Sequence, residues 1–253
     1  MCFKRKPPEP IVNCQRMILT SAINNYPRTG NDLNGCINDQ SDLISKLPQW
    51  NVKAFRDSEA TIRNFRDNVK NYILGMKSGD FLIIQYSGHG TRVRDNSGDE
   101  ADGYDEALYL YDGTFTDDSF NELMLLIPEG AKVMVVLDSC FSGTATRNKG
   151  KYFKPKYIAP TEDRSWVQNK IVKDAPLNHL VFSGCKSDQT SADALIGSRY
   201  NGAFTYFWLR AMRQGMTYRE WINETVRLIS LNGFEQVPTL EGPEEMLDQV
   251  IFS

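Results

Sequence analysis

Two apolar segments, FLIIQYS at 81–87 and KVMVVLDS at 132–139, hardly alternate between apolar and polar residues. A strand with one wet face alternates with a period of two, so strands like these are covered on both faces. Segments with helical spacing separate them, as in 59–76, where apolar residues recur every three or four positions. This order of elements predicts an α/β fold with a mostly parallel sheet and helices on both faces.

The same patterns give the remaining elements. We expect strands at 16–23, 51–57 and 179–184, a short strand or a hairpin at 106–112, and helices at 37–47, 59–76, 117–127, 201–213 and 217–231. Residues 1–12 contain three prolines and predict an irregular arm. A length of 253 residues suits one large domain over 13–253, whose last segment, MLDQVIFS, is expected to be a short strand or a docking tail.

Composition excludes several classes of protein. A net charge of −3 gives no basic excess for nucleic-acid binding. No apolar run approaches the roughly 20 residues of a membrane span, and the start lacks the apolar core of a secretory signal. The five cysteines are odd in number and widely spaced, with neither a disulfide framework nor paired metal spacing. We therefore expect a cytoplasmic protein with reduced thiols.

The two long apolar strands end on groups that carry chemistry. His89 follows the first between two glycines, and Cys140 follows the second. Sites in open parallel sheets lie beyond the carboxyl ends of the strands. An imidazole can take the proton of a thiol, and glycine N–H groups can stabilise an oxyanion. The pair fits acyl transfer by a cysteine, although a lone cysteine or histidine is usually structural, as we expect for Cys185 and His179.

Four ordered motifs carry a family resemblance: YSGHG at 86–90, DGYDEALYLYDG at 102–113, DSCFSG at 138–143 and SGCKSDQTSADA at 183–194. Cys140 lies 51 residues after His89, close to the caspase spacing. The chain resembles metacaspases and the prokaryotic orthocaspases, caspase-like clan CD cysteine peptidases of family C14. The resemblance implies a caspase-hemoglobinase fold with a central, mostly parallel six-stranded sheet flanked by helices. It also implies His89 as general base, Cys140 as nucleophile, and the N–H groups of Gly90 and Cys140 as the oxyanion hole.

Asp138 stands two residues before the nucleophile, where a carboxylate raises the thiol pKa and opposes catalysis. Such an acid is explained if it receives a cationic substrate side chain. The resemblance implies a substrate pocket of Cys36, Asp39, Ser87 and Asp138. For Asp39 alone, an acid favoured at a helix N-terminus is the other interpretation. We predict cleavage after Arg or Lys and not after Asp.

Nine acids and no lysine or arginine lie between Asp95 and Asp118. Clustered oxygens suit Ca²⁺, although a solvated acidic loop has the same composition. The resemblance implies Ca²⁺ ligands at Asp105, Asp117 and Asp118, with Ca²⁺ as an activator and no cofactor needed for the chemistry itself. A fourth family aspartate is missing, and Arg147 lies near its expected place.

The domain divides by resemblance into a part like the caspase large subunit (13–147), a basic linker (148–177) and a part like the small subunit (178–253). Five basic residues and no acid lie between Thr144 and Lys156. A peptidase that cuts after basic residues could cut itself there; the alternative is a solvated loop that stays intact. The arm carries Lys4, Arg5 and Lys6, which could cross the acidic pocket as an inhibitor.

Taken together, these patterns predict a monomeric cysteine endopeptidase acting on proteins or peptides with Arg or Lys before the cut bond, self-processing and stimulated by Ca²⁺. One rival is a catalytically silent caspase-like domain that binds partners. Another is a thioesterase or amidase with the same dyad, for which two pocket acids would serve no purpose.

Overall fold

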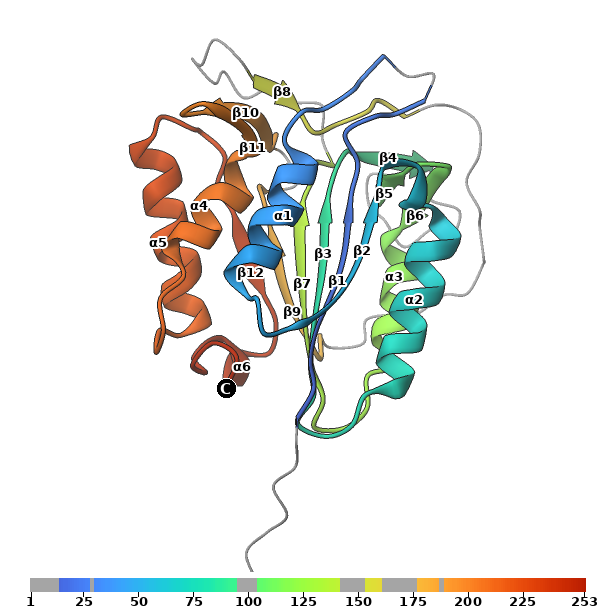
Figure 1. Ribbon diagram of the computed structural model, residues 1–253, viewed down its shortest axis with the longest axis vertical. Helices are drawn as coiled ribbons and strands as arrows, with labels where there is room; N and C mark the ends of the chain where they lie inside the picture. The colour runs from blue at the N-terminus through green and yellow to red at the C-terminus, as the bar shows by residue number, and fades with distance from the viewer. Residues whose placement is uncertain (1–13, 28–29, 95–103, 142–152, 161–176, 187–188) are drawn as a thin grey trace, which may run out of the picture.

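A six-stranded sheet forms the centre of the protein, which is described here by a computed structural model for residues 14–27, 30–94, 104–141, 153–160, 177–186 and 189–253 (Figure 1). The strand order is β12-β9-β7-β3-β1-β2. All neighbouring pairs are parallel except β12 and β9. The strands span Arg16–Ala22 (β1), Asn51–Arg56 (β2), Phe81–Ser87 (β3), Lys132–Asp138 (β7), Leu180–Ser183 (β9) and Thr239–Glu241 (β12). The predicted sheet is confirmed.

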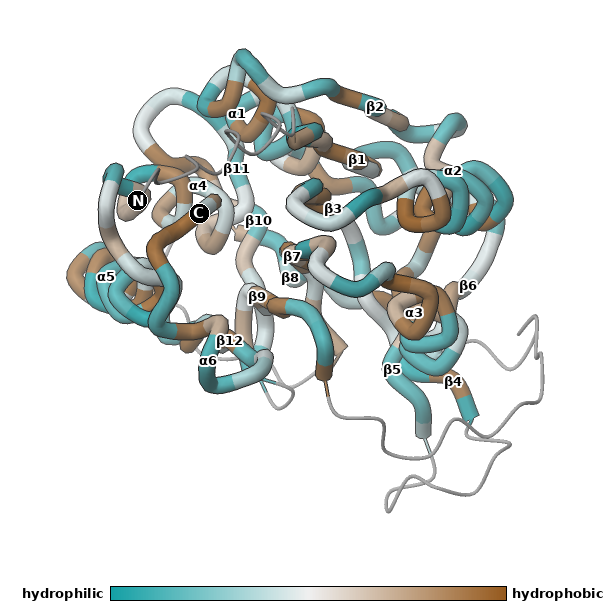
Figure 2. Tube along the Cα trace, turned by 90° about the horizontal axis from the view of Figure 1, so that it is seen from below, coloured by the Kyte–Doolittle hydropathy of each residue, from teal (hydrophilic) through white to brown (hydrophobic). Residues whose placement is uncertain are grey.

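Helices cover both faces of this sheet, as the uninterrupted apolar strands require. On one side in Figure 1 lie α1 (Cys36–Lys46), α4 (Ala203–Ala211) and α5 (Tyr218–Leu231); on the other lie α2 (Ile62–Gly75) and α3 (Asp117–Met124). Successive residues of β3 point to opposite faces, so that Leu82 joins one apolar cluster and Ile83 the other. Figure 2 looks along the sheet and shows apolar segments between the two helical layers.

Two small antiparallel sheets stand at the carboxyl end of the central sheet (Figure 1). One contains β4 (Gly90–Arg94), β5 (Tyr104–Leu110) and β6 (Gly113–Thr116); the other contains β8 (Phe153–Pro155), β10 (Ala192–Ile196) and β11 (Arg199–Gly202). The predicted strand at 106–112 belongs to the first. The strands β4, β6, β8, β10, β11 and β12 escaped prediction because three to five residues carry too little periodicity.

Several predicted boundaries move. The helix expected at 59–76 begins at Ile62, after a 3-10 turn over Asp57–Glu59, because the Thr61 hydroxyl accepts the Asn64 N–H at 3.2 Å and caps it. The helix expected at 201–213 begins at Ala203, because the residues before it form β11.

The end of the chain docks on the fold, as one of the two expectations had it. A helical turn, α6 (Glu244–Leu247), is followed by a bridge between Val250 and Thr217 and by the Phe252 ring, which packs against Trp50. The arm over 1–12 lies outside the described residues. Among the helices that the structure describes, none is both long and apolar enough to cross a bilayer.

His179 begins the segment that leads into β9 and is only 3% exposed. Burial lowers the pKa of its imidazole from 6.5 to about 4. As the pH falls, the unfolded chain therefore protonates this imidazole at a higher pH than the folded protein does. The free energy of unfolding consequently decreases as the pH drops from 6.5 toward 4. We expect wild type to lose about 2 kcal/mol more than His179→Gln between pH 7 and pH 5.

Urea unfolding at the two pH values measures this difference. Comparison with His179→Gln isolates one group, since His89 titrates in both proteins. Equal losses in the two proteins would show that His179 is not held neutral by the fold.

Candidate active site

The carboxyl ends of β3 and β7 bring the predicted histidine and cysteine boxes side by side. The two strands pair in parallel with Ser87 opposite Asp138, so His89 and Cys140 each follow two residues later. The backbones approach closely, because a Cβ on Gly90 would lie 2.0 Å from the Cys140 carbonyl oxygen. Only glycine fits at position 90, and its N–H faces the same space as the Cys140 N–H.

The Cys140 side chain is fully buried against the main chain of Ser191. Its sulfur accepts the Ser191 N–H at 2.5 Å and donates to the Ser191 carbonyl at 3.3 Å. Burial raises the pKa of the thiol well above its ordinary value, and contact with Cys185 and the charge of Asp138 raise it further. In this conformation the thiol keeps its proton, so that it needs a base to become a nucleophile.

His89 has the tautomer of a general base fixed by its surroundings. Its Nε2 lies 2.6 Å from the Asn31 carbonyl oxygen, which can only accept, so Nε2 carries the proton. Nδ1 is buried and has no hydrogen-bond partner among the described residues. Burial lowers the pKa of the imidazole to about 4. The free lone pair on Nδ1 is therefore available to take a proton.

Tyr26 orients the histidine from a second direction. Its hydroxyl accepts a hydrogen bond from the backbone N–H of His89 at 2.8 Å, and the centroids of the two rings lie 4.6 Å apart. Sequence patterns did not identify Asn31 or Tyr26. Asn31 acts through its carbonyl, which every residue has, and Tyr26 lies in a loop whose proximity to His89 depends on the whole sheet.

Asp39 lies in the first turn of α1, as expected, but it faces inward and is fully buried. Its carboxylate accepts hydrogen bonds from the Ser87 hydroxyl at 2.7 Å, the Asn201 amide at 3.1 Å and the Gly202 N–H at 2.9 Å. Burial raises the pKa of Asp39 to about 7, against the lowering effect of Lys156 and of the hydrogen bonds from Ser87 and Asn201. Three donors and a cation mark a site built for a negative charge.

Asp138, the last residue of β7, is also fully buried. Its carboxylate accepts from the Ser191 hydroxyl at 2.8 Å and from the hydroxyl and N–H of Thr205 at 2.6 and 3.1 Å. The N–H of Thr205 belongs to the first turn of α4, whose positive end favours an anion. Ser191 and Thr205 were not predicted as site residues, although Ser191 lies within the SADA part of a quoted motif.

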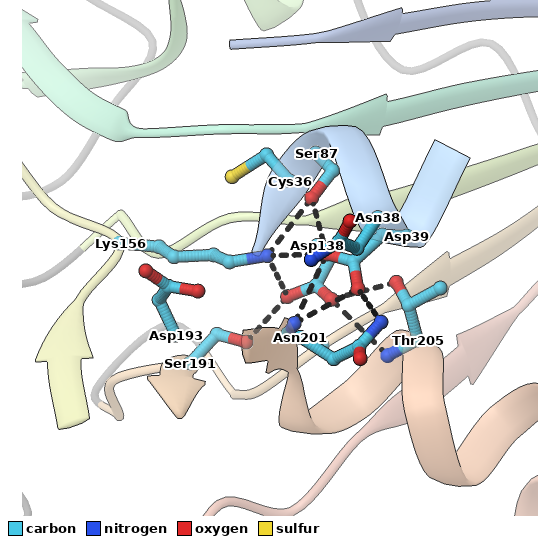
Figure 3. A network of polar contacts seen from close by, with 12 residues as sticks. Cys36, Asn38, Asp39, Ser87, Asp138, Lys156, Ser191, Asp193, Asn201 and Thr205 are labelled. Atoms are coloured by element: carbon cyan, nitrogen blue, oxygen red, sulfur yellow. Dashed lines mark hydrogen bonds and ion pairs between the residues drawn. The ribbon is translucent and has the colours of Figure 1, made fainter. Parts of the chain in front are cut away.

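A cation fills the space between the two carboxylates, and it comes from the chain itself (Figure 3). The Lys156 Nζ lies 3.1 Å from Asp39 Oδ2 and 3.1 Å from Asp138 Oδ1, and it donates to the Ser87 hydroxyl at 2.9 Å. All three charged side chains are 0% exposed. Burial alone would lower the pKa of Lys156, but Asp138 and its other anionic neighbours raise it well above the ordinary value. The lysine is therefore charged.

The main chain of Lys156 crosses the dyad at the same time. Its carbonyl oxygen accepts the N–H of Gly90 at 2.9 Å and the N–H of Cys140 at 3.1 Å, the two groups predicted to form the oxyanion hole. Its own N–H donates to the Ser191 carbonyl at 3.1 Å, the same oxygen that receives the Cys140 thiol. The side chain of Lys156 thus lies between the two carboxylates, and its carbonyl accepts two backbone N–H groups next to the Cys140 thiol.

The remaining wall of this pocket contains Cys36 and Gly202. Cys36 is fully buried, and its thiol pKa is raised by burial and lowered by Lys156. A Cβ on Gly202 would lie 2.0 Å from an Asp138 oxygen and 2.4 Å from the Lys156 Nζ. Glycine at 202 therefore leaves the room that the lysine occupies. The predicted pocket residues Cys36, Asp39, Ser87 and Asp138 all surround this one cation.

The predicted calcium ligands lie away from this pocket, at β5 and the start of α3. Burial raises the pKa of Asp117 to about 7; the Asp118 N–H lowers it, and the charges of Asp118 and Asp105 raise it. Across the described part of the chain, no three or more His, Cys, Asp or Glu side chains form a group that could hold a metal ion. The described residues do not fit a complete metal centre, and calcium binding stays a prediction.

Other predicted features lie outside the described residues: Lys4, Arg5 and Lys6 of the arm, and Arg147. Cys185 is buried, and its thiol donates hydrogen bonds to the carbonyls of Gln189 and Ser139 at 3.3 and 3.7 Å. Because Ser139 directly precedes Cys140, Cys185 lies beside the nucleophile.

Comparison with known proteins identifies the class. A family model described as the caspase domain matches residues 15–245. The chain is 30% identical to Metacaspase-2 of Arabidopsis thaliana over 85% of its own length and 56% of that protein. It is 27% identical to Metacaspase-1 of Schizosaccharomyces pombe over 85% of its length and 64% of that protein. The chain therefore spans less than two thirds of these two relatives.

Two solved structures are similar. A crystal structure of a Geobacter sulfurreducens protein superposes with a TM-score of 0.76 at 26% identity, covering 94% of this chain and 98% of that one. Caspase-1 of Spodoptera frugiperda superposes with a TM-score of 0.64 at 13% identity, covering 95% and 90%. The second likeness concerns the fold alone, and it agrees with the predicted caspase-hemoglobinase architecture.

Replacing the buried lysine by an uncharged residue leaves two carboxylates facing each other. In a Cys140→Ala background, we expect Lys156→Met to lower the free energy of unfolding by about 3 kcal/mol. Chemical denaturation at pH 7 measures it. Lys154→Met is the matched control, because that side chain is exposed and we expect a change within about 0.5 kcal/mol. Equal effects of the two substitutions would contradict a buried ionic contact of Lys156 with Asp39 and Asp138.

Proposed function

The chain belongs to the caspase family of cysteine peptidases, and from that premise we propose that it is an endopeptidase that hydrolyses peptide bonds after Lys or Arg. Cys140 is the nucleophile of this proposal, His89 the general base, and Asp39 and Asp138 the groups that select the residue before the cut bond.

The observation that carries the proposal is the position of Lys156. A peptidase must hold the side chain of the residue before the cut bond, polarise the carbonyl of that same residue and bring a nucleophile to it. Lys156 receives all three from separate parts of the chain: two carboxylates, two backbone N–H groups, and the Cys140 thiol, which is hydrogen-bonded to the neighbouring Ser191 carbonyl. A buried salt bridge serving stability alone would not need the carbonyl contacts.

The chemistry follows from these contacts. The Cys140 thiol gives its proton to His89 Nδ1, and the sulfur attacks the carbonyl carbon. The oxyanion that forms accepts the N–H groups of Gly90 and Cys140. The C–N bond breaks, His89 returns the proton to the departing amine, and an acyl-enzyme remains. Water, deprotonated by His89, then attacks the thioester, releases the new carboxylic acid and restores the thiol.

Charge selects the substrate. Two fully buried carboxylates attract a cation and repel an aspartate, since an unpaired third anion among them would be strongly unfavourable. Arginine fits the same description, because its planar fork can donate to both carboxylates. A thioesterase or amidase with the same cysteine and histidine would have no use for two acids that select a cation. The two acids therefore support proteins and peptides with basic residues as the substrates.

We further propose that the chain begins as an inactive precursor and activates itself by cutting between Lys156 and Tyr157. With Lys156 in place no substrate can enter the pocket. Burial keeps the pKa of His89 low and that of Cys140 high, so the single cut after Lys156 is slow in the closed state. Departure of the lysine from the pocket admits water, relieves both shifts and speeds proton transfer from thiol to imidazole in later turnovers.

Three finer points belong to the same proposal. Stimulation by Ca²⁺ is supported by the family resemblance and by the crowding of Asp105, Asp117 and Asp118, but no catalytic step depends on it. A monomer is supported by the same resemblance. The cytoplasm is supported by the number and spacing of the cysteines.

Peptides carrying a fluorophore after Arg, Lys or Asp test the activity. We expect release after Arg and Lys only, at least a thousandfold loss in Cys140→Ala, and at least a tenfold loss of kcat/KM in Asp138→Asn. Parallel assays with Ca²⁺ and with a chelator test the metal. Cys185→Ala, a buried thiol beside the nucleophile, is the control and should keep activity.

Release after Asp would show that the acidic pocket is misassigned. No release from folded protein, even after Lys156 is removed, would favour the silent binding domain.

Self-cleavage is tested by intact-mass measurement during storage of purified protein. We expect fragments that end at Lys156 and begin at Tyr157, formed at a rate independent of protein concentration because the lysine is already in the pocket. Lys156→Arg should be cut and Lys156→Gln should not, since Gln carries no charge for the two acids. Lys154→Gln is the matched control. Fragments at other positions only, or a rate that rises with concentration, would contradict cleavage within one chain.

A further inference from the structure

A second thiol lies beside the nucleophile. The strand β9 pairs in parallel with β7, with Ser183 opposite Leu137, and the Gly184 N–H continues this ladder to the Leu137 carbonyl at 2.8 Å. Cys140 and Cys185 lie just beyond the ends of these two strands, and their side chains are in contact. Both are free cysteines. Two reduced sulfur atoms therefore meet at the carboxyl edge of the sheet, where the chemistry takes place.

The second thiol works against the first. Burial is the main cause of the raised pKa of Cys140, and contact with Cys185 raises it further, so that the nucleophile is harder to deprotonate. The Cys185 thiol donates only to the carbonyls of Ser139 and Gln189, and a serine hydroxyl could donate to the same oxygens. A buried cysteine often serves as a small apolar residue, but alanine would fill that role without opposing catalysis. The sulfur of Cys185 therefore calls for a role of its own.

The positions of the two residues suit a disulfide. Two steps beyond the pair of Leu137 and Ser183, the register sets Ser139 opposite Cys185, so that Cys140 lies one residue farther along. At the usual spacing of neighbouring strands, such residues have Cα atoms about 6 Å apart, which is within the span of a disulfide. Because both residues lie beyond the regular strands, the alternation of side chains along a strand does not hold them apart.

We propose that Cys140 and Cys185 form a redox-modification site, in which a hydroperoxide oxidises the nucleophile and Cys185 then closes a reversible disulfide with it. The inference goes beyond peptide hydrolysis, because it gives the same sulfur a second reaction partner. While the disulfide lasts, Cys140 cannot attack a carbonyl. A disulfide of this kind is transient in a reducing compartment, and it protects the nucleophile from further, irreversible oxidation.

Two steps account for every atom. His89 takes the Cys140 proton, and the thiolate attacks one oxygen of the hydroperoxide; the O–O bond breaks, the sulfur becomes a sulfenic acid, and the departing alkoxide takes the proton from His89. The Cys185 sulfur then attacks the sulfenic sulfur, the S–O bond breaks, and hydroxide leaves with the Cys185 proton as water. Two thiols are oxidised, and one peroxide is reduced to an alcohol and water.

Lys156 controls access to the site. With the lysine in its pocket, the Cys140 side chain is 0% exposed, and the Lys156 carbonyl accepts the Cys140 N–H at 3.1 Å beside it. A buried, protonated thiol reacts poorly with peroxide. We therefore expect the disulfide to form once the lysine has left, either by self-cleavage or by substitution.

Peroxide treatment followed by peptide mapping tests the site. Folded protein is exposed to hydrogen peroxide, blocked with iodoacetamide and digested with trypsin, which isolates Cys140 in residues 133–147 and Cys185 in residues 174–186. We expect these two peptides to be joined, both in the self-processed wild type and in Lys156→Ala, which vacates the pocket without cleavage. A dithiol should separate the peptides and restore peptidase activity.

Two variants separate a resolving thiol from a bystander. In Cys185→Ala, we expect Cys140 to gain two or three oxygen atoms, and reduction should restore about tenfold less activity than in wild type. Cys14→Ala is the matched control. Cys14 is also a free cysteine, but it precedes β1 at the opposite end of the sheet, so its loss should leave the joined peptides and the recovery unchanged.

The outcomes separate this site from the proposed peptidase. Unlinked peptides, or equal recovery of wild type and Cys185→Ala, would overturn the redox site and leave the peptidase intact. A reversible loss of two hydrogen atoms in Cys185→Ala would overturn it as well, because Cys140 would then have bonded to the Ser191 nitrogen, 2.5 Å from its sulfur. Joined peptides from a protein that cuts no substrate would support the redox site and overturn the proposed function.

Discussion

The buried contact of Lys156 with Asp39 and Asp138 is the interaction on which the arrangement of this site depends. Two carboxylates with no exposed surface need a cation, because desolvation without compensation is far more costly than any packing gain nearby. Their hydrogen-bond partners come from β3, the segment before β10, β11 and α4, so this charge cluster joins elements that lie far apart in the sequence. The position of the 153–158 segment follows from it: once the lysine enters the pocket, its carbonyl reaches the N–H groups of Gly90 and Cys140.

The parallel register of β3 and β7 determines where this cluster can form. Ser87 lies opposite Asp138, and each strand continues by two residues to a chemically active side chain. A slip of one residue would turn Ser87 and Asp138 to opposite faces and separate the hydroxyl from the carboxylate. The strands are apolar on both faces, so the two layers of helices hold this register without any help from the site. The scaffold can therefore tolerate two buried acids at its edge.

Sequence patterns predicted the parts of the site that lie at strand ends or in motifs. His89, Cys140 and Asp138 were singled out because apolar strands have a readable pattern and because a carboxylate beside a thiol demands a reason, whereas Asp39 was singled out by the family resemblance. Lys156 was noted only as one of five basic residues between Thr144 and Lys156, since a three-residue strand gives no periodic signal. Asn31 acts through its backbone carbonyl, and Gly202 through the absence of a side chain near an atom 64 positions earlier in the chain. Such roles come from three-dimensional proximity and leave no local pattern.

The same two carboxylates explain both selectivity and latency. A lysine attached to the protein is present at an effective concentration far above that of a separate peptide, so a substrate with equal contacts cannot displace it. Cutting the chain after Lys156 weakens this advantage without altering any residue of the pocket: Lys156 stays attached through Pro155 but loses its link to Tyr157, so that the new chain end can leave the pocket. A pocket strong enough to bind a basic substrate is for that reason also strong enough to close itself, and a single peptide bond separates the two states. The β8–β10 pairing strengthens the closure, since the strand adds main-chain contacts that a shorter peptide would lack.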